Sequence, residues 1–137
     1  MVCHDIPAGL LEDPLIQTDF SASYGYRFTR WNNIDVFIYF GHHRVTFPPP
    51  AWIATAHRHG VKILGTLIFE WKEGADESVL LLTDTISHRG KTKSAPAKHH
   101  YARQLVRLAK HCGFDGYLMN FESSIPKDLV PKLIEFL

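Results

Sequence analysis

The sequence predicts an α/β protein with a parallel sheet covered by helices. Two observations support this prediction. Short apolar runs rich in β-branched and aromatic residues recur along the chain, and segments with apolar residues at helical spacing lie between them. The order is strand, loop, strand, helix, strand, helix, strand, helix, which is the order of successive right-handed βαβ units.

The apolar runs are the expected strands. Residues 34–40, IDVFIYF, are almost uninterruptedly apolar, as in a strand buried on both faces. Residues 61–69, VKILGTLIF, and residues 117–121, YLMNF, repeat this pattern. Upstream, residues 1–4 are expected to form a short opening strand, and residues 5–30, dense in Gly, Pro, Asp and Ser, a loop.

Two helices are predicted between the strands and one after the last strand. Residues 51–59 and 101–112 carry apolar side chains at helical spacing, and each segment is directly followed by a glycine, the residue favoured just after a helix. The helical pattern of residues 129–137 begins after Asp128, a candidate N-cap, which places Pro131 in the tolerated first turn.

These elements amount to about four βα units, which is half of a (β/α)₈ barrel. Two architectures fit: a compact four-stranded α/β sheet, or part of a larger barrel. We expect the second, because the chain stops within a helical pattern just after the fourth strand. Residues 84–100, DTISHRGKTKSAPAKHH, are expected to form a surface loop or an insertion.

Composition excludes several classes of protein. Lys plus Arg number 15 and Asp plus Glu number 14, so no basic excess points to nucleic acid. No run of 18 apolar residues predicts a membrane span, and residues 1–9 lack the pattern of a secretion signal. Cys3 and Cys112 match no zinc or redox spacing and are expected to be buried free thiols. A cytosolic protein is the inference.

The end of the last predicted strand carries the best candidates for chemistry. Asn120 and Glu122 are two residues apart, so on a strand they share a face, at the carboxyl end where α/β enzymes place catalytic groups. An apolar surrounding there disfavours the ionised carboxylate, which suits a general acid. The alternative is that Phe121 points to the core while its two neighbours begin a solvated loop.

A glycosidase ordinarily needs a second carboxylate beside the bond that it cleaves. Asp115 lies at the opposite end of the predicted strand, roughly 20 Å from Glu122 at about 3.3 Å per residue. It therefore cannot act on the same bond. If Glu122 is the acid of a glycosidase, its partner is either a carboxylate from another strand or the substrate itself.

Other polar residues end the other predicted strands. His42 and His43 follow residues 34–40, Glu70 and Trp71 follow residues 61–69, and Asp5 follows the opening strand. All five are candidates for substrate binding at the carboxyl edge of the sheet, with Trp71 suited either to stacking on a sugar or to closing the rim of a barrel. The histidines occur as neighbours or at i,i+2, which does not converge on one ion, so neither a metal nor another cofactor is expected.

Three blocks of this sequence are long and unusual in combination. They are VCHD…GLLED, then IDVFIYFGHHRVTFPPPAWIATAHRHGVKILGTLIFEW, then ARQLVRLAKHCGFDGYLMNFE. Together they resemble the endo-β-N-acetylglucosaminidases of glycoside hydrolase family 85. The resemblance covers most of residues 2–137 and is weaker over residues 72–98.

The resemblance implies a (β/α)₈ barrel, of which residues 1–137 supply the N-terminal half of the catalytic domain. It also implies cleavage of the chitobiose core of N-linked glycans, between the two N-acetylglucosamines. The nucleophile in the family is the 2-acetamido oxygen of the substrate, which closes an oxazoline and retains the configuration. The matching positions are Glu122 as general acid/base and Asn120 as the residue that orients the acetamido group.

The sequence leaves other functions open. A non-catalytic half barrel that binds glycan or another chain is the main alternative, and a metal-dependent hydrolase is disfavoured by the spacing of the histidines. The expected partners are N-glycans or glycopeptides. The 137-residue chain on its own is expected to be inactive or nearly so, and to self-associate through open strand edges.

Overall fold

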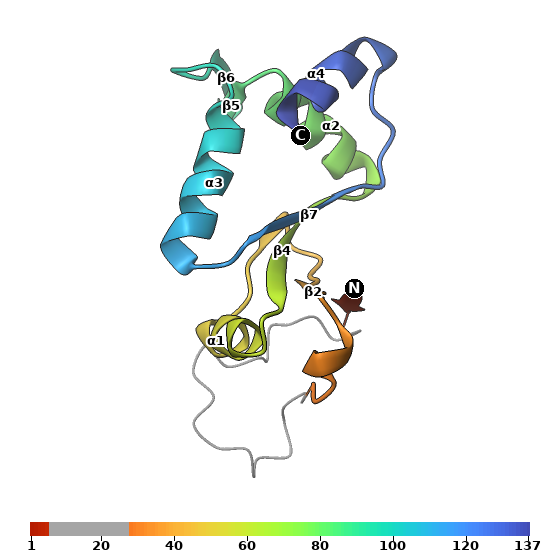
Figure 1. The fold of residues 1–137 in the computed structure, drawn as a ribbon. Coiled ribbons are helices and arrows are strands. Elements are labelled where there is room, and N and C mark those ends of the chain that lie inside the picture. Colours follow the sequence, from red (N-terminus) through yellow and green to blue (C-terminus); the bar gives the residue numbers. More distant parts are fainter. Residues whose placement is uncertain (6–27) are drawn as a thin grey trace. The chain divides into compact units, whose positions relative to one another are not determined.

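The computed structural model describes residues 1–5 and 28–137. Most of the loop expected over residues 5–30, and the GLLED block of the family resemblance, lie outside the described residues. The chain forms two compact units, which are described separately (Figure 1). The first unit comprises Met1–Leu67 with Ala109–Met119, and the second comprises Ile68–Leu108 with Asn120–Leu137.

The first unit contains a sheet of five strands. β1 (Val2–His4) pairs in parallel with β2 (Val36–Tyr39), and β2 pairs in parallel with β4 (Lys62–Phe69). The short β3 (Val45–Thr46) pairs antiparallel to β4, and β7 (Gly116–Phe121) also pairs with β4. β4 is therefore the central strand, and the mostly parallel sheet with helices confirms the predicted α/β class.

β7 runs parallel to β4. The Asp115 N–H donates to the Ile63 carbonyl at 2.9 Å, before β7 begins, and the Glu122 N–H donates to the Phe69 carbonyl at 3.0 Å, after β7 ends. Both strands therefore advance in the same direction, and their carboxyl ends lie at the same edge. Residues 68–69 and 120–121, the ends of these two strands, belong to the second unit.

Aromatic side chains make up much of the core of the first unit. Trp31, in the 3₁₀ turn η2 (Trp31–Asn33), and Trp52, in α1 (Pro50–Arg58), are both buried. Phe37 of β2 lies between them, with ring centroids 5.0 Å from Trp31 and 5.2 Å from Trp52. Burying three such rings removes a large apolar area from water and fixes α1 against the sheet.

Gly65 in the middle of β4 is required by close packing. A Cβ at this position would lie 2.4 Å from the carbonyl oxygen of Thr46, which belongs to β3. Only a residue without a side chain lets β3 approach β4 at this point.

The second unit contains α2 (Trp71–Leu82), the hairpin of β5 (Thr85–His88) and β6 (Lys91–Ser94), most of α3 (His100–Cys112), the 3₁₀ turn η3 (Lys127–Leu129) and α4 (Val130–Phe136). No helix was predicted over residues 71–82, where α2 lies. The buried positions of α2 are Gly74, Ser78, Leu81 and Leu82, at helical spacing. Two of these four residues are small and not hydrophobic. The buried face of α2 therefore lacks the regular large apolar side chains that predict a helix.

The other predicted helices and strands agree with the structure in type and approximate position, with one correction. Asp128 is not the N-cap of the last helix, because it lies inside η3, and the residue before α4 is Leu129. Pro131 does lie in the first turn of α4. Residues 85–88 and 91–94 form paired strands inside the segment expected to be a surface loop or insertion.

The two cysteines are free thiols, but the expected burial is wrong for Cys3, which is exposed on β1. Cys112 is partly buried and packs against the core of the first unit. Within the described part of the chain, no helix is both long enough and apolar enough to cross a membrane.

Candidate active site

Asn120 and Glu122 lie on the same face where β7 ends. The Nδ2 group of Asn120 donates a hydrogen bond to Oε1 of Glu122 at 3.0 Å. The i,i+2 spacing on an extended backbone places the two side chains next to each other. Asn120 is half-buried, whereas Glu122 is exposed, so the described residues do not provide the apolar surrounding expected from the sequence.

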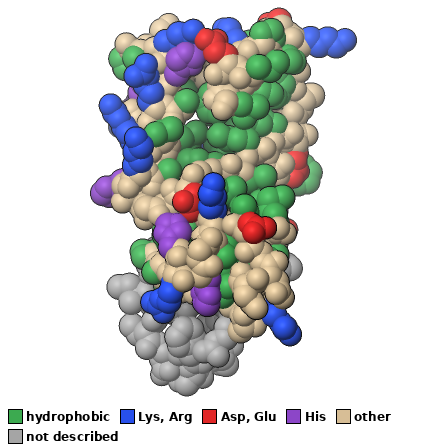
Figure 2. Space-filling model, viewed as in Figure 1, with side chains coloured by type: hydrophobic (Ala, Val, Ile, Leu, Met, Phe, Trp, Pro, Cys, Tyr) green, Lys and Arg blue, Asp and Glu red, His purple; other side chains and the backbone are tan. Residues whose placement is uncertain are grey.

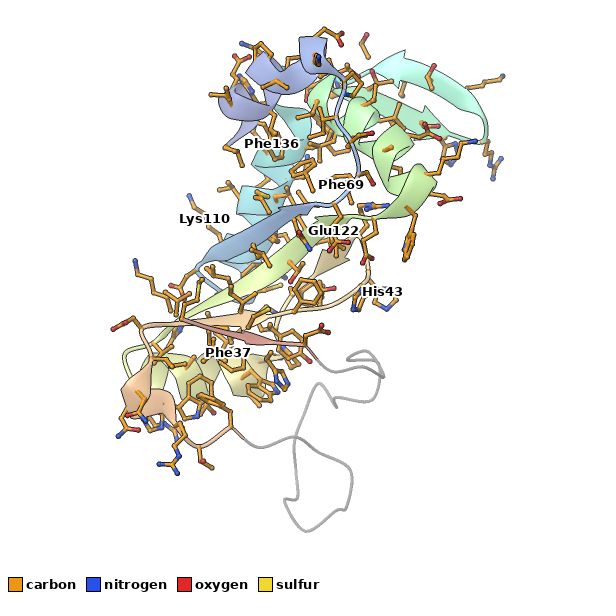
Figure 3. All side chains as sticks on the ribbon, turned by 90° about the vertical axis from the view of Figure 1, so that its right-hand side faces the viewer. Phe37, His43, Phe69, Lys110, Glu122 and Phe136 are labelled. Carbon is orange, nitrogen blue, oxygen red and sulfur yellow. The ribbon has the colours of Figure 1, made fainter. Side chains whose placement is uncertain are left out.

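The backbone around Glu122 is held by the end of β4. The N–H groups of Glu122 and Ser123 both donate to the carbonyl oxygen of Phe69 at 3.0 Å. The rings of Phe69 and Phe121 stack, with centroids 4.7 Å apart and planes at 17°. Figure 3 shows Phe69 and Glu122 where these two neighbouring strands end. Glu122 therefore projects from a fixed strand end and not from a loose loop.

Ser123 holds the backbone next to Glu122, and it was not among the candidates from the sequence. Its hydroxyl lies 2.7 Å from the carbonyl oxygen of Trp71 and 3.1 Å from that of Phe69. It thereby ties the residue after Glu122 to the first residue of α2. The only sequence signal is a small hydroxyl residue next to the candidate acid, which is too common to single out.

Trp71 combines exposure with an unusual backbone. Its side chain is 80% exposed, and its φ of 59° lies in the left-handed region that non-glycine residues rarely adopt. Such strain at the start of a helix persists only where the surroundings enforce it, and it is concentrated at functional sites. Glu70 precedes Trp71 in extended conformation, at the carboxyl end of β4.

Gly74 allows the first turn of α2 to approach the end of β4. A Cβ at this position would lie 2.7 Å from the backbone carbon of Phe69 and 3.1 Å from the hydroxyl of Ser123. The absence of a side chain at this position therefore lets Trp71 and Glu70 lie close to Ser123, which follows Glu122 in sequence.

The remaining candidates belong to the first unit. Nε2 of His42 lies 3.5 Å from Oδ1 of Asp5, and both side chains are about half exposed. The structure thus brings together two residues that are 37 positions apart and that the sequence marked separately. His43 is exposed in the same loop after β2.

Asp115 has a structural role. Its Oδ2 accepts hydrogen bonds from the Ile63 N–H and from Nε2 of His57, both at 2.8 Å. Desolvation alone raises the pKa of this carboxyl, but the Ile63 N–H, the His57 hydrogen bond and charge, and the charge of Lys62 outweigh it and lower the pKa overall. Asp115 thus joins α1 to the start of β4.

The paired histidines have separate tasks. His57 contacts Asp115, while the ring of His59 lies parallel to that of Trp31, with centroids 6.0 Å apart. Among residues 1–5 and 28–137, no three His, Cys, Asp or Glu side chains are arranged to hold a metal ion.

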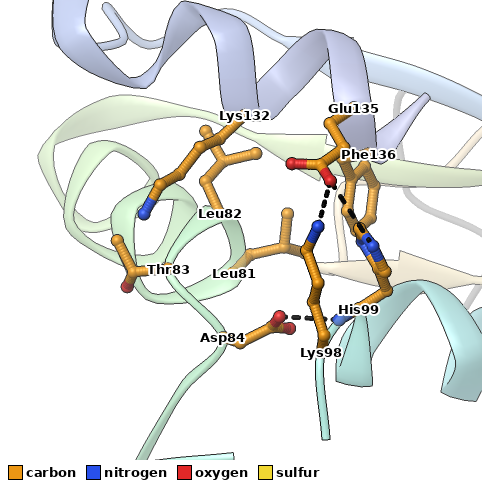
Figure 4. A pocket seen from close by; sticks show the side chains of 9 residues that line it. All are labelled: Leu81, Leu82, Thr83, Asp84, Lys98, His99, Lys132, Glu135 and Phe136. Carbon is orange, nitrogen blue, oxygen red and sulfur yellow. Dashed lines mark hydrogen bonds and ion pairs between the residues drawn. The ribbon is translucent and has the colours of Figure 1, made fainter.

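A cavity of about 200 Å³ lies in the second unit, and no candidate residue lines it (Figure 4). The Lys98 ammonium pairs there with the Glu135 carboxylate, which also lies 3.6 Å from Nε2 of His99. The lining residues are Leu81, Leu82, Thr83, Asp84, Lys98, His99, Lys132, Glu135 and Phe136. Lys98, His99 and Glu135 thus pair with one another, and the Asp84 carboxylate accepts the backbone N–H groups of His99 and His100.

Comparison with known proteins places this arrangement in a family. The sequence model of "Glycosyl hydrolase family 85" matches residues 11–137. The chain is 43% identical over 136 residues to Cytosolic endo-beta-N-acetylglucosaminidase 1 of Arabidopsis thaliana, covering 99% of this chain and 18% of that protein. It is 41% identical over 137 residues to Cytosolic endo-beta-N-acetylglucosaminidase of Homo sapiens, covering 100% of this chain and 17% of that protein.

A third relative, Cytosolic endo-beta-N-acetylglucosaminidase of Danio rerio, is 40% identical over 138 residues, covering 100% of this chain and 18% of that protein. The chain therefore spans less than a fifth of the length of these curated relatives. Because the family match extends over almost all of its residues and includes the end of β7, the chain belongs to glycosyl hydrolase family 85.

Proposed function

We propose that this chain carries the catalytic acid/base of an endo-β-N-acetylglucosaminidase that cleaves the chitobiose core of N-linked glycans, between the two N-acetylglucosamines. The observation that supports this proposal most directly is the Asn120–Glu122 hydrogen bond at the carboxyl end of β7, in a member of family 85. The parallel strands and their helices then form part of a (β/α)₈ barrel. The relatives are named as cytosolic, and we assign the same compartment here.

The hydrogen bond suggests how the two side chains divide the work. Asn120 uses Nδ2 to hold Oε1 of Glu122, which leaves Oε2 of Glu122 to carry the proton for the leaving oxygen. It also leaves Oδ1 of Asn120 to accept a hydrogen bond from the N–H of the substrate's 2-acetamido group. That bond holds the acetamido oxygen in line with the anomeric carbon, in a near-attack geometry.

The first step forms the bond between the acetamido oxygen and the anomeric carbon while the glycosidic C–O bond breaks. Glu122 gives its proton to the departing oxygen, and a cyclic oxazolinium is left. In the second step Glu122, now a carboxylate, takes a proton from water as the water oxygen attacks the anomeric carbon and the ring opens. Two inversions give overall retention, and Glu122 is protonated again.

The exposed residues at the strand ends are assigned to substrate binding. The indole of Trp71, 80% exposed, suits stacking on the apolar face of a sugar ring. In the second unit, Glu70 supplies a hydrogen-bond group after β4, and in the first unit His42, His43 and Asp5 supply such groups after β2 and β1. No protein carboxylate needs to act as nucleophile in this mechanism, and Glu70 is assigned to binding alone.

A second candidate is a glycan-binding half barrel without catalysis. The observation that favours it is the exposure of Glu122, because the described residues place no apolar wall around this carboxylate. In the catalytic proposal, the bound substrate shields Glu122 from water.

The test measures glycan release from an N-glycopeptide by a longer polypeptide in which residues 1–137 belong to a complete (β/α)₈ barrel, as wild type, Glu122→Gln and Glu70→Gln. We expect Glu122→Gln to lower kcat by about 10²–10⁴-fold. Glu70→Gln should chiefly raise KM. Full activity of Glu122→Gln refutes the catalytic assignment, and a loss of kcat in Glu70→Gln equal to that in Glu122→Gln indicates a two-carboxylate mechanism instead. Glycopeptide binding with no hydrolysis by the wild type establishes the second candidate.

A further inference from the structure

The hairpin β5–β6 belongs to a strongly cationic segment of an otherwise balanced chain. Residues 85–108 contain six Lys or Arg and three His, and no Asp or Glu, although the whole chain has 15 basic and 14 acidic residues. Lys, Arg and His side chains gather along the edge of Figure 2 on which Figure 1 places α3 and the hairpin. The overall charge of +1 conceals this local separation.

The register of the hairpin fixes which backbone groups face outward. Thr85 is opposite Ser94, Ile86 opposite Lys93, Ser87 opposite Thr92, and His88 opposite Lys91. Just before this ladder, the Ala95 N–H donates to the Asp84 carbonyl at 2.7 Å, so Asp84 and Ala95 form a hydrogen-bonded pair. Hydrogen-bonded and non-hydrogen-bonded pairs alternate in an antiparallel ladder. The backbone groups of Thr92 and Ser94 in β6 therefore point away from β5.

The outer edge of β5 is already in use at its base. By the same alternation the carbonyl of Thr85 points outward, and it accepts a hydrogen bond from the hydroxyl of Tyr101 at 2.8 Å. β6 differs, because its four residues are all exposed, and no strand among residues 1–5 and 28–137 pairs with its outer edge. β6 thus offers the N–H and C=O of Thr92 and Ser94 to a further strand.

The side chains divide the hairpin into two faces. Ile86, His88, Lys91 and Lys93 share one face, and Thr85, Ser87, Thr92 and Ser94 share the other. On the first face, Lys91 and Lys93 stand two residues apart along β6, both exposed. Neither lysine forms an ion pair with another described residue. An added strand would place its alternate side chains directly beside them.

The tip of the hairpin carries backbone strain. Arg89 and Gly90 form a two-residue turn with φ of 51° and 73°, the left-handed pair of a type I′ turn. Asn or Asp usually occupies the first of these positions, and Arg there is unfavourable. The strained position adds one more cation to the end of the same ribbon.

We propose that the outer edge of β6 binds an extended acidic peptide as a third strand, with Asp or Glu at alternate positions beside Lys91 and Lys93. The peptide backbone pairs with the N–H and C=O of Thr92 and Ser94. Backbone pairing provides the affinity and the alternating charges set the register, as in other cases of strand addition. A nucleic acid is also a polyanion, but it has no peptide N–H and C=O groups that could pair with Thr92 and Ser94. The proposal is independent of the hydrolytic activity.

The test uses fluorescence anisotropy with the 137-residue chain at low salt. The probe is a labelled nonapeptide of alternating Glu and Thr, and its control has the same composition with the glutamates contiguous. We expect the alternating peptide to bind at least tenfold more tightly. Lys91→Glu/Lys93→Glu should abolish binding, while Arg58→Glu/Lys127→Glu, an equal change of charge at other exposed positions, should leave it unchanged.

The contribution of backbone pairing is tested by changing β6 in one experiment and the peptide in another. Thr92→Pro removes an outward N–H without removing a bond inside the hairpin, and binding should fall at least tenfold although both lysines remain.

Independently of how that variant folds, two probes are N-methylated, one at the odd amides and one at the even amides. One of them should lose binding and the other should keep it, because alternate amides face β6. Equal binding by both N-methylated probes overturns the proposal, and so does equal binding by the contiguous control. Tighter binding of a single-stranded oligonucleotide that is insensitive to Thr92→Pro also overturns it.

Discussion

The side-chain amide of Asn120 donates a hydrogen bond of 3.0 Å to the carboxylate of Glu122 at the end of β7. The backbone N–H groups of Glu122 and Ser123 are in turn bonded to the carbonyl oxygen of Phe69. This bond orients both groups before any substrate arrives. Preorganised polar groups of this kind lower a barrier because they need not reorganise during the reaction.

The task assigned to Asn120 predicts a substrate-dependent defect. Asn120→Ala should lower kcat on a glycopeptide by about 10²–10³-fold, because the acetamido group is no longer held for attack. The same variant should still turn over a preformed sugar oxazoline, since ring closure has already occurred in that substrate. Kinetics on both substrates check this, and an equal loss on both would show that Asn120 acts only through the position of Glu122.

Substitutions of Trp71 should affect stability through its backbone and substrate binding through its ring. Its φ of 59° costs an L-residue roughly 1–2 kcal/mol, so Trp71→Gly should be more stable than Trp71→Ala by about 1 kcal/mol. This is the reverse of the order expected inside a helix. Urea unfolding measures the difference, and both variants should raise KM by up to about tenfold through loss of ring stacking. Trp52→Ala is the control, because removing this buried ring should cost about 3–5 kcal/mol.

Asp115 should give the fold an acid-sensitive component. Because its pKa is lower in the folded chain than in the unfolded chain, its contribution to stability is present above the unfolded value of about 4. That contribution is lost as the pH falls through the lower folded pKa. Urea unfolding of wild type and Asp115→Asn between pH 7 and pH 2.5 should show a gap that narrows below about pH 4. A gap that stays constant over this range would assign the effect to packing.

The 137-residue chain should self-associate and give little or no glycan release by itself. Within the described part of the chain, β1 pairs only with β2 and β7 only with β4, so each has an edge open to another strand. Sedimentation velocity should show species that grow with concentration. Cys3→Lys, which puts a charge on the exposed strand β1, should reduce the association, with Cys3→Ser as the control for thiol oxidation. A monodisperse monomer with a sharp melting transition would contradict this prediction.

The positions of most helices and strands follow from local pattern. A glycine follows the last turns of α1 and α3 within two residues, and Gly60 and Gly113 have φ of 70° and 85°. α2 was not predicted because its buried stripe includes Gly74 and Ser78 in place of large apolar residues, and the small size of Gly74 matters only against the end of β4. The predicted cap at Asp128 was wrong because the chain makes a 3₁₀ turn there before α4 begins.

By itself, the sequence determined that Asn120 and Glu122 share a face, because the two-residue period of a strand is a local property of the backbone. It also determined the family, through blocks long enough to be specific. Only the tertiary structure showed that Ser123 bonds to the start of α2, that Trp71 is held with a left-handed backbone, and that Asp115 pairs with His57. The Ser123 and Asp115 bonds join residues far apart in the chain, and the backbone of Trp71 depends on the residues packed around it. The spacing of side chains along one segment carries no information about such long-range contacts.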